Sequence, residues 1–477
     1  MFNNLFGKTF RITFLSIFIA EVISFLVQGV VQLNNLFFLL IAGAVLILSL
    51  FKLEYGLYAL WAELLISSKG YLFYFTLAGQ RISLRIGLFV VILSVWLWRF
   101  VFKKDRKFFI GNQWLNGYLF LAAVIILGLT AGLLNNRLSN VFLDANAWLF
   151  FLMAPVWFSA LASEKIIRNI LAILLSAAGY LSVQTLALAA LFSRQLPPVS
   201  APLYQWIRSS GLGEITPLGD GFYRIFFQSQ IYLLVALFLT LALLILTKPK
   251  KGERVWLSAV AALSSTALLA SLSRSFWLGL IAGILFLLIM GAIKFKLSFK
   301  YLTGIILILI SAFVLELGFL SLLAGNYYPK VLFGRLTNPT EEAAGSSRLQ
   351  QFKPLIKSIS QHWLLGAGFG KTVTYISNDP RVREKSPSGL YTAYAFELGY
   401  LDIWLKLGVL GLLAYLYLIA KIVQASLKLG VLGISLILGL IAIAVTSVFS
   451  PYLNHPLGIG FIILSTAIIN YLPKNEQ

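Results

Sequence analysis

The chain has 477 residues, of which 59% are hydrophobic and 12% are charged, and its mean hydropathy is +0.89. A membrane-spanning helix needs about 20 consecutive apolar residues, and runs of this kind recur along the whole sequence. The composition therefore excludes a soluble globular domain and predicts an all-α polytopic membrane protein. The formal net charge of +21 does not indicate nucleic-acid binding, because the basic residues lie in short loops where the positive-inside rule accounts for them.

The apolar runs predict about twelve to fourteen transmembrane helices in a single transmembrane domain over residues 1–477. Their expected positions are 12–30, 34–51, 54–68, 86–102, 114–133, 146–163, 167–192, 226–247, 255–271, 275–293, 301–323, 397–420, 429–449 and 457–472. The first run is long for a signal peptide and lacks a small-residue cleavage site, so we expect a retained span. Two larger loops interrupt the pattern, a shorter one at 194–225 and a longer one at 324–396.

Loops rich in lysine alternate with loops whose positive residues are mostly arginine. The lysine-rich loops, which include 103–107 and 248–254, are expected in the cytoplasm together with both termini. The arginines then expected on the outer side are Arg81, Arg85, Arg137, Arg194, Arg208, Arg224 and Arg274. In "SLSRSFWLGL", residues 271–280, Arg274 stands between two spans where topology does not require a cation. This position predicts an anionic ligand outside the membrane.

The long outer loop contains a predicted amphipathic helix. Its apolar residues recur at helical spacing and are Leu349, Phe352, Leu355, Ile356, Ile359 and Trp363, whereas Lys353, Lys357 and Gln361 take the opposite face. Such a helix is typical of the membrane interface. Ser346 or Ser347 is expected to cap its start, with Arg348 at its N-terminus.

The segment "GAGFGKT", residues 366–372, matches a phosphate-binding loop only in part. That pattern needs a glycine five residues before the Gly-Lys pair, and this position is Leu365. The segment also lies on the predicted outer side, away from cytoplasmic nucleotides. We therefore expect its glycines to form a tight turn after the amphipathic helix, and we expect no nucleotide site.

Charged residues near the start of the span at 397–420 are candidates for chemistry. Glu397 is either a capping carboxylate favoured by the helix dipole or a general base. Asp402 and Lys406, four residues apart, are expected to form an internal ion pair that neutralises both charges.

Tyrosines of the outer side have two interpretations. Tyr391, Tyr394 and Tyr400 belong either to an interfacial aromatic belt or to a surface that stacks against sugar rings. His362 and His455 are far apart in the sequence and have no further ligand at metal spacing, so no metal site is expected.

Four segments, in this order, resemble the O-antigen ligase and O-antigen polymerase superfamily of bacterial membrane glycosyltransferases. They are "YRIFFQSQ" at 223–230, "SLSRSFWLGL" at 271–280, "SSRLQQFKPLIKSISQHWLLGAGFG" at 346–370 and "LGYLDIWLKLGVLG" at 398–411. Arg224, Arg274 and Arg348 take the arginine positions of that pattern, and Arg224 is expected at the start of a helix. Ligases of the family usually carry His-Asn where this chain has Glu397-Leu398, so the glutamate either keeps the role of the base or indicates a different acceptor.

The resemblance implies a GT-C-like fold and glycan transfer at the outer face of the bacterial cytoplasmic membrane, in surface polysaccharide assembly. The implied donor is a glycan on polyprenyl pyrophosphate, and the implied acceptor is a hydroxyl of a glycan or a lipid. No cofactor, metal, nucleotide or nucleic acid is implied. A ligase and a polymerase differ only in the acceptor, and the sequence does not separate them.

Residue roles follow from the same resemblance. Arginine stays ionised and matches phosphate oxygens with two N–H groups, so Arg224 and Arg274, together with Arg208 or Arg348, are predicted to bind the pyrophosphate. Glu397 is predicted to deprotonate the acceptor, and the sugar or acceptor is expected at Tyr391, Tyr394 and Tyr400. The alternative function is a lipid-linked glycan flippase or another polytopic transporter, since transporters also combine many spans with buried charges.

Overall fold

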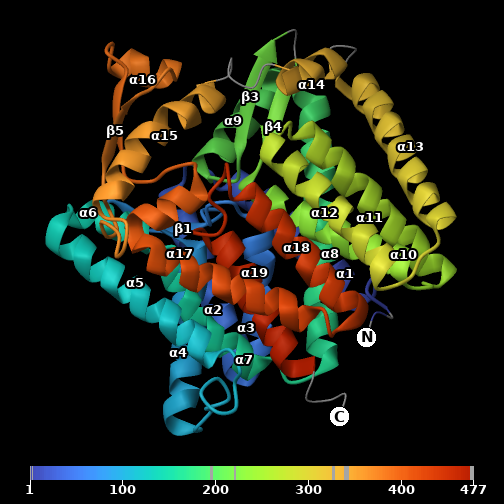
Figure 1. Cartoon of the computed structure of the whole chain (residues 1–477), viewed down its shortest axis with the longest axis horizontal. Coiled ribbons are helices and arrows are strands. Elements are labelled where there is room, and N and C mark those ends of the chain that lie inside the picture. The colour runs from blue at the N-terminus through green and yellow to red at the C-terminus, as the bar shows by residue number, and fades with distance from the viewer. Residues whose placement is uncertain are drawn as a thin grey trace.

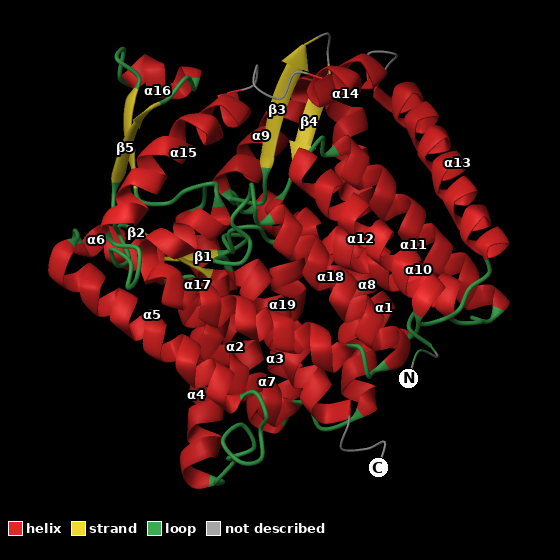
Figure 2. Cartoon of the chain, in the orientation of Figure 1, coloured by secondary structure: helices red, strands yellow, loops and turns green. Residues whose placement is uncertain are grey.

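The structure, a computed structural model, describes residues 2, 4–193, 197–219, 222–324, 328–337 and 343–472. These residues form a bundle of helices with small hairpins between them (Figure 1, Figure 2). Arg194, one of the arginines expected on the outer side, lies outside the described residues.

The helices are α1 (Lys8–Leu26), α2 (Val31–Phe51), α3 (Leu53–Ile66), α4 (Leu84–Phe102), α5 (Leu115–Asn135), α6 (Leu138–Ala145), α7 (Ala154–Ala160), α8 (Glu164–Ser193), α9 (Pro197–Ser209), α10 (Ile231–Leu246), α11 (Lys251–Ala270), α12 (Arg274–Ile293), α13 (Phe299–Ala324), α14 (Tyr328–Thr337), α15 (Ala343–Gln361), α16 (Pro380–Lys385), α17 (Gly399–Ser426), α18 (Gly430–Thr446) and α19 (Pro456–Tyr471). Two short 3₁₀ helices, η1 (Trp148–Met153) and η2 (Gln228–Gln230), precede α7 and α10.

Every expected span coincides with helical structure, which confirms the all-α polytopic fold class. Among the described residues, nine helical segments are long and apolar enough to cross a membrane, and the bent pair formed by α6 and the η1–α7 segment gives a tenth. The four other expected spans are α3, α11, α18 and α19, which are shorter or less apolar than this criterion requires. A helix enclosed by protein can remain shorter and more polar than a lipid-exposed one, because its neighbours replace lipid.

α8 and α10 lie at the centre of the bundle. In the most apolar stretch of α8, 83% of the residues are buried, compared with 11% for α13, and Figure 1 shows α13 at the edge of the molecule. α10 packs against α11 and α18, and α18 also packs against α12. Gly279 permits the close approach of α12 to α18, because a Cβ there would lie 3.0 Å from the carbonyl oxygen of Ala442. This packing brings the start of α12 close to the loop that follows α18.

Three antiparallel hairpins were not predicted. They pair β1 (Tyr74–Leu77) with β2 (Gln80–Ser83), β3 (Glu214–Gly219) with β4 (Phe222–Phe226), and β5 (Val373–Ile376) with β6 (Leu390–Ala393). Strands of four to six residues contain too few alternating positions to stand out between long apolar runs. The expectation that Arg224 begins a helix is wrong, because Arg224 lies on β4 opposite Thr216.

Some of the segments that are predicted to lie on the cytoplasmic side contact one another. The backbone N–H of Asn4 donates to Glu253 at 2.8 Å, so the N-terminal segment meets the lysine-rich loop before α11. Lys104 and Lys107 line one pocket together with Tyr471, at the end of α19. In Figure 1 the loop between α4 and α5 lies at the bottom of the view, whereas the β3/β4 hairpin lies at the top.

The predicted Asp402–Lys406 ion pair is confirmed, and it has further members. The ammonium nitrogen of Lys406 lies 2.7 Å from Asp402 and 2.5 Å from Asp144. Asn454 donates its side-chain amide to Asp402 at 2.5 Å. The three charged side chains are buried, so this cluster ties α17 to α6 and to the loop before α19.

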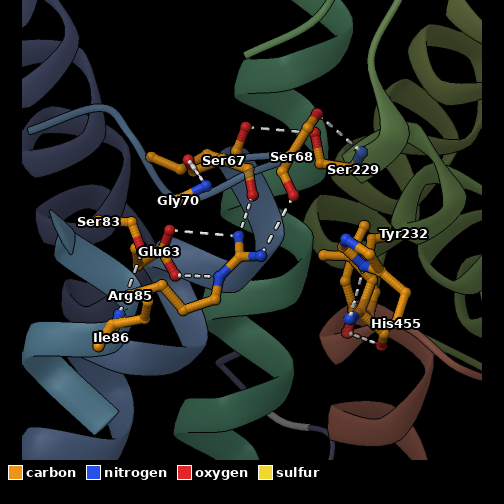
Figure 3. Close-up of polar contacts among 12 residues, drawn as sticks. Glu63, Ser67, Ser68, Gly70, Ser83, Arg85, Ile86, Ser229, Tyr232 and His455 are labelled. Atoms are coloured by element: carbon orange, nitrogen blue, oxygen red, sulfur yellow. Dashed lines mark hydrogen bonds and ion pairs between the residues drawn. The ribbon is translucent and has the colours of Figure 1, made fainter. Parts of the chain in front are cut away.

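A second buried pair, Glu63 with Arg85, joins α3 to α4 (Figure 3). The Nε of Arg85 donates to Glu63 at 2.9 Å, and its Nη1 donates to the carbonyl of Ser68 at 3.1 Å. The hydroxyl of Ser68 in turn donates to the carbonyl of Leu212 at 2.5 Å and accepts from the backbone N–H of Ser229 at 3.3 Å. The network therefore fixes the loop after α3 against the segments on either side of the β3/β4 hairpin.

Replacing Arg85 with methionine is expected to destabilise the protein by about 3–5 kcal/mol, because Glu63 would keep a buried charge without its partner. Thermal unfolding in detergent, followed by tryptophan fluorescence, measures the change. The double variant Glu63→Leu/Arg85→Met removes both charges and is expected to recover most of the loss. An Arg85→Met protein that unfolds at the wild-type temperature would contradict this interpretation.

Candidate functional site

Three of the predicted arginines and Glu397 line one cavity of about 310 Å³. Arg224 comes from β4, Arg274 from the start of α12, Arg348 from α15 and Glu397 from the turn before α17. The other lining residues are Glu214, Phe226, Gln228, Leu272, Ser273, Ser275, Phe449, Ser450, Pro451, Tyr452 and His455. We call this space the arginine cavity. Four segments that are far apart in the chain thus contribute the three arginines and Glu397.

Arg274 is the first residue of α12 and follows a tight turn. Leu272 in that turn has a φ of +50°, a left-handed conformation that side chains other than glycine rarely adopt. The hydroxyl of Ser275 lies 3.1 Å from that of Ser273 and 3.2 Å from that of Ser450. These contacts tie the turn to the loop after α18, so the backbone that presents Arg274 is fixed on both sides.

Arg224 is held against the same turn. Its Nε donates to the carbonyl of Ser271 at 2.9 Å, and its guanidinium carbon lies 4.6 Å from the centroid of the Phe226 ring. The hydrogen bond links β4 to the turn between α11 and α12. Arg224 and Arg274 therefore stand on two neighbouring pieces of backbone that support one another.

Arg348 and Glu397 form an ion pair across the arginine cavity. The Nε of Arg348 lies 2.6 Å from a carboxylate oxygen of Glu397, and the two side chains are 25% and 43% exposed. The pair is partly solvated, so its carboxylate stays accessible from the cavity. The side-chain oxygen of Gln351, one turn further along α15, accepts the backbone N–H of Glu397 at 3.4 Å and fixes the turn that carries it.

The start of the amphipathic helix differs from the prediction. α15 begins at Ala343, so neither Ser346 nor Ser347 caps it, and Arg348 lies inside the helix rather than at its end. Alanine is the strongest helix former, and the Ala343–Ala344 pair extends the helix toward the N-terminus. The longer helix places Arg348 one turn before Gln351, and both residues contact Glu397.

Only part of the apolar face of α15 packs against protein. Leu355 and Ile359 are buried in a cluster with Leu405 of α17, whereas Leu349 and Phe352 are 63% and 50% exposed. Exposed apolar residues on a helix of this kind are typical of a membrane interface.

The glycine-rich segment forms the expected tight turn. Gly366, Gly368 and Gly370 all have φ values between +76° and +79°, and a Cβ on Gly368 would lie 2.3 Å from the backbone nitrogen of Gly132. The backbone N–H of Gly370 donates to Asp144 at 2.8 Å. The turn therefore packs against α5 and joins the Lys406 cluster.

Glu397 does not act as a helix cap in this structure. α17 begins at Gly399 after the N-cap residue Leu398, and no side-chain hydrogen bond caps its first turn. The carboxylate is directed to Arg348 instead. Of the two interpretations of Glu397 that the sequence left open, the structure therefore disfavours the cap.

Two polar residues of the arginine cavity were missed as site candidates. His455 was considered only as a metal ligand, and its Nδ1 accepts the backbone N–H of Leu457 at 3.3 Å. Burial, together with the positive charges of Arg85 and Lys69, lowers the pKa of His455 to about 3, so this imidazole is neutral at physiological pH. The side-chain oxygen of Gln228 is buried and has no hydrogen-bond partner among the described residues, which makes it an acceptor for a ligand hydroxyl.

The remaining predicted residues lie outside the arginine cavity. Arg208 does not line the cavity; it lies 3.6 Å from Glu214, which does. The hydroxyl of Tyr400 donates to the carbonyl of Ala444 at 2.9 Å, so Tyr400 links α17 to α18. Tyr391, on β6, is 43% exposed, and Tyr394 lies between β6 and α17.

Metal ligands do not cluster in the part of the chain that the structure describes. Within those residues, no group of three or more histidine, aspartate or glutamate side chains is placed to hold a metal ion.

Comparison with known proteins identifies one family. Residues 259–416 match the family model described as O-antigen ligase, a range that runs from α11 into α17 and includes Arg274, Arg348 and Glu397. No curated protein matches the chain. The family match supports the resemblance and covers three of the four segments that carry it, whereas "YRIFFQSQ" at 223–230 lies outside the matched range. Residues 259–416 are therefore the part of this chain that is similar to the O-antigen ligase family.

Proposed function

We propose that this protein transfers a glycan from polyprenyl pyrophosphate to an acceptor hydroxyl, at the outer face of the bacterial cytoplasmic membrane, in surface polysaccharide assembly. The observation that carries the proposal is the meeting of Arg224, Arg274, Arg348 and Glu397 around one cavity. Three arginines together with the Glu397 carboxylate suit a reaction in which an anionic group leaves and a proton is removed. The second carboxylate of the cavity, Glu214, pairs with Arg208. The family match supports the same class of reaction.

The arginines bind the pyrophosphate of the donor. When the bond between the anomeric carbon and the phosphate oxygen breaks, negative charge develops on the leaving pyrophosphate. Donors held in position before the reaction stabilise that charge without a cost of reorganisation, and guanidinium groups match phosphate oxygens with paired N–H groups. Arg224 and Arg274 are held at the α11–α12 turn, and Arg348 completes the clamp from α15. Arg208 stays outside this clamp and acts on it only through Glu214.

Glu397 is the general base. The acceptor oxygen attacks the anomeric carbon as the bond to the phosphate oxygen breaks, the pyrophosphate departs with the electron pair, and the acceptor proton passes to the Glu397 carboxylate. Arg348 holds that carboxylate in the resting site and turns to the pyrophosphate when the donor enters. A single displacement of this kind inverts the configuration at the anomeric carbon. The proposed reaction needs no nucleotide, because the donor carries its own leaving group, and no metal, because the arginines provide the positive charge that stabilises the leaving pyrophosphate.

The position of the arginines and Glu397 favours glycan transfer over glycan transport. A flippase moves its ligand through the membrane and needs access from both faces. The arginine cavity instead lies where the β3/β4 hairpin, the start of α12 and the start of α17 meet, and these segments belong to the predicted outer side.

Deletion of the gene in its own host tests the proposal. Deleted cells are expected to lose the finished polysaccharide and to accumulate lipid-linked glycan that a membrane-impermeant glycosidase can digest in spheroplasts. Wild-type protein restores the product, whereas Arg274→Ala does not. Accumulation of lipid-linked glycan that the glycosidase cannot reach would contradict transfer and identify a flippase.

A further inference from the structure

Glu397 lines two cavities. One is the arginine cavity, and the other is a space of about 570 Å³ enclosed by α15, α16 and the β5/β6 hairpin. These elements lie together at the upper left of Figure 1. We call this second space the tyrosine cavity, and the lining residues that matter here are Ser347, Tyr375, Ser377, Lys385, Tyr391 and Glu397. The proposed base therefore stands where two separate binding spaces adjoin.

The wall between the two cavities is built from α15. Arg348 faces the arginine cavity, and its neighbour Ser347 faces the tyrosine cavity. Gln351 is buried, donates its amide to the hydroxyl of Tyr375 at 2.9 Å and accepts the backbone N–H of Glu397 at 3.4 Å. One glutamine thus sets the position of Glu397 relative to the tyrosine cavity.

The chemistry of the tyrosine cavity differs from that of the arginine cavity. As far as the chain is described, no arginine lines it, and half of its lining side chains carry hydroxyl groups, beside the charged groups of Asp379, Lys385 and Glu397. Tyr391 is 43% exposed and packs edge-on against Tyr375, with ring centroids 5.8 Å apart. Hydroxyl groups beside an exposed aromatic ring suit a carbohydrate, which combines many hydroxyls with apolar ring faces. An acyl chain would need an apolar lining instead.

We infer that the tyrosine cavity binds the acceptor, and that the acceptor is a glycan chain. The inference rests on the proposed function, because it takes Glu397 as the base. The sugar that carries the attacking hydroxyl lies next to Glu397, and the adjoining sugar stacks on Tyr391. The donor pyrophosphate occupies the arginine cavity on the other side of the carboxylate. The acceptor is therefore recognised through its sugars and not through a lipid.

A transfer assay with the full-length protein in nanodiscs tests the inference. The donor is the host's own lipid-linked glycan, and the acceptor is the oligosaccharide released from that lipid by mild acid. Tyr391→Ala is expected to raise the KM for the oligosaccharide by about tenfold, the loss of one stacking contact, and to leave the KM for the donor unchanged. Tyr391→Phe keeps the ring and is expected to stay near the wild-type value.

Binding of the released oligosaccharide, measured by saturation-transfer NMR, separates this inference from the proposed function. Wild type and Arg274→Ala are both expected to bind it, whereas Tyr391→Ala is expected to bind it weakly. Equal oligosaccharide binding by wild type and Tyr391→Ala would overturn the acceptor site while leaving the transferase intact. Transfer to a monoglycosylated lipid, with none to the oligosaccharide, would overturn the glycan acceptor. Full transfer activity in Arg274→Ala would instead contradict the proposed function.

Discussion

Replacing Glu397 with glutamine is expected to slow glycan transfer by about 10²–10⁴-fold, the usual contribution of a general base. Glutamine keeps the size of the side chain but cannot accept the proton of the acceptor hydroxyl. Because Glu397 is 43% exposed and caps no helix, the protein is expected to fold as the wild type does. The rate constant for transfer in nanodiscs, at saturating donor and acceptor, measures the effect.

The matched control is Glu384→Gln, which removes an exposed carboxylate from α16 on the same side of the bundle. This variant is expected to keep the wild-type rate. Glu397→Asp retains a base on a shorter side chain and is expected to fall between wild type and Glu397→Gln. Equal transfer rates for wild type and Glu397→Gln would show that Glu397 is not the general base.

Arg274→Ala is expected to reduce the transfer rate by about 10²–10³-fold, the typical cost of losing one donor to a developing negative charge. Arg274→Lys is expected to restore only part of that rate, because an ammonium is a point charge and lacks the paired N–H groups of a guanidinium. The same assay measures both variants, with the amount of folded protein determined by size-exclusion chromatography.

Arg81→Ala is the matched control for Arg274. Arg81 is exposed on β2, and its guanidinium carbon lies 4.4 Å from the centroid of the Tyr74 ring, outside the arginine cavity. Its loss removes one positive charge from the expected outer side and is expected to leave transfer unchanged. A similar loss of rate in Arg81→Ala and Arg274→Ala would show that net charge, and not the clamp, is responsible.

The sequence predicts helices and their order well, because long apolar runs carry that information locally. It also predicts that Arg224, Arg274 and Arg348 belong together, although that prediction came from the resemblance and not from spacing. Contacts between helices that are far apart in the sequence cannot be predicted in this way. The ion pair of Lys406 with Asp402 is visible as an i, i+4 spacing, whereas its contact with Asp144 joins α17 to α6 and leaves no local pattern.

The polar residues that line the cavities could not be predicted from the sequence for the same reason. Gln228 and His455 are single polar residues in short connections, and only the packing of α18 against α10 and α12 brings those connections together. The β5/β6 hairpin is too short for its alternation to be recognised, so the sequence analysis names Tyr391 as a sugar-binding candidate but does not predict the cavity that it lines. Tyr391 could be identified as a surface aromatic, but its position beside Glu397 depends on the fold of the long loop.

Glycan transfer can be measured directly with the purified protein. Purified wild-type protein in nanodiscs is supplied with a polyprenyl-pyrophosphate oligosaccharide and a glycan acceptor, with no added metal or nucleotide. We expect a lengthened glycan and an equal amount of released polyprenyl pyrophosphate. No transfer to a glycan or lipid acceptor, together with movement of the same donor across a liposome membrane that contains the protein, would contradict it.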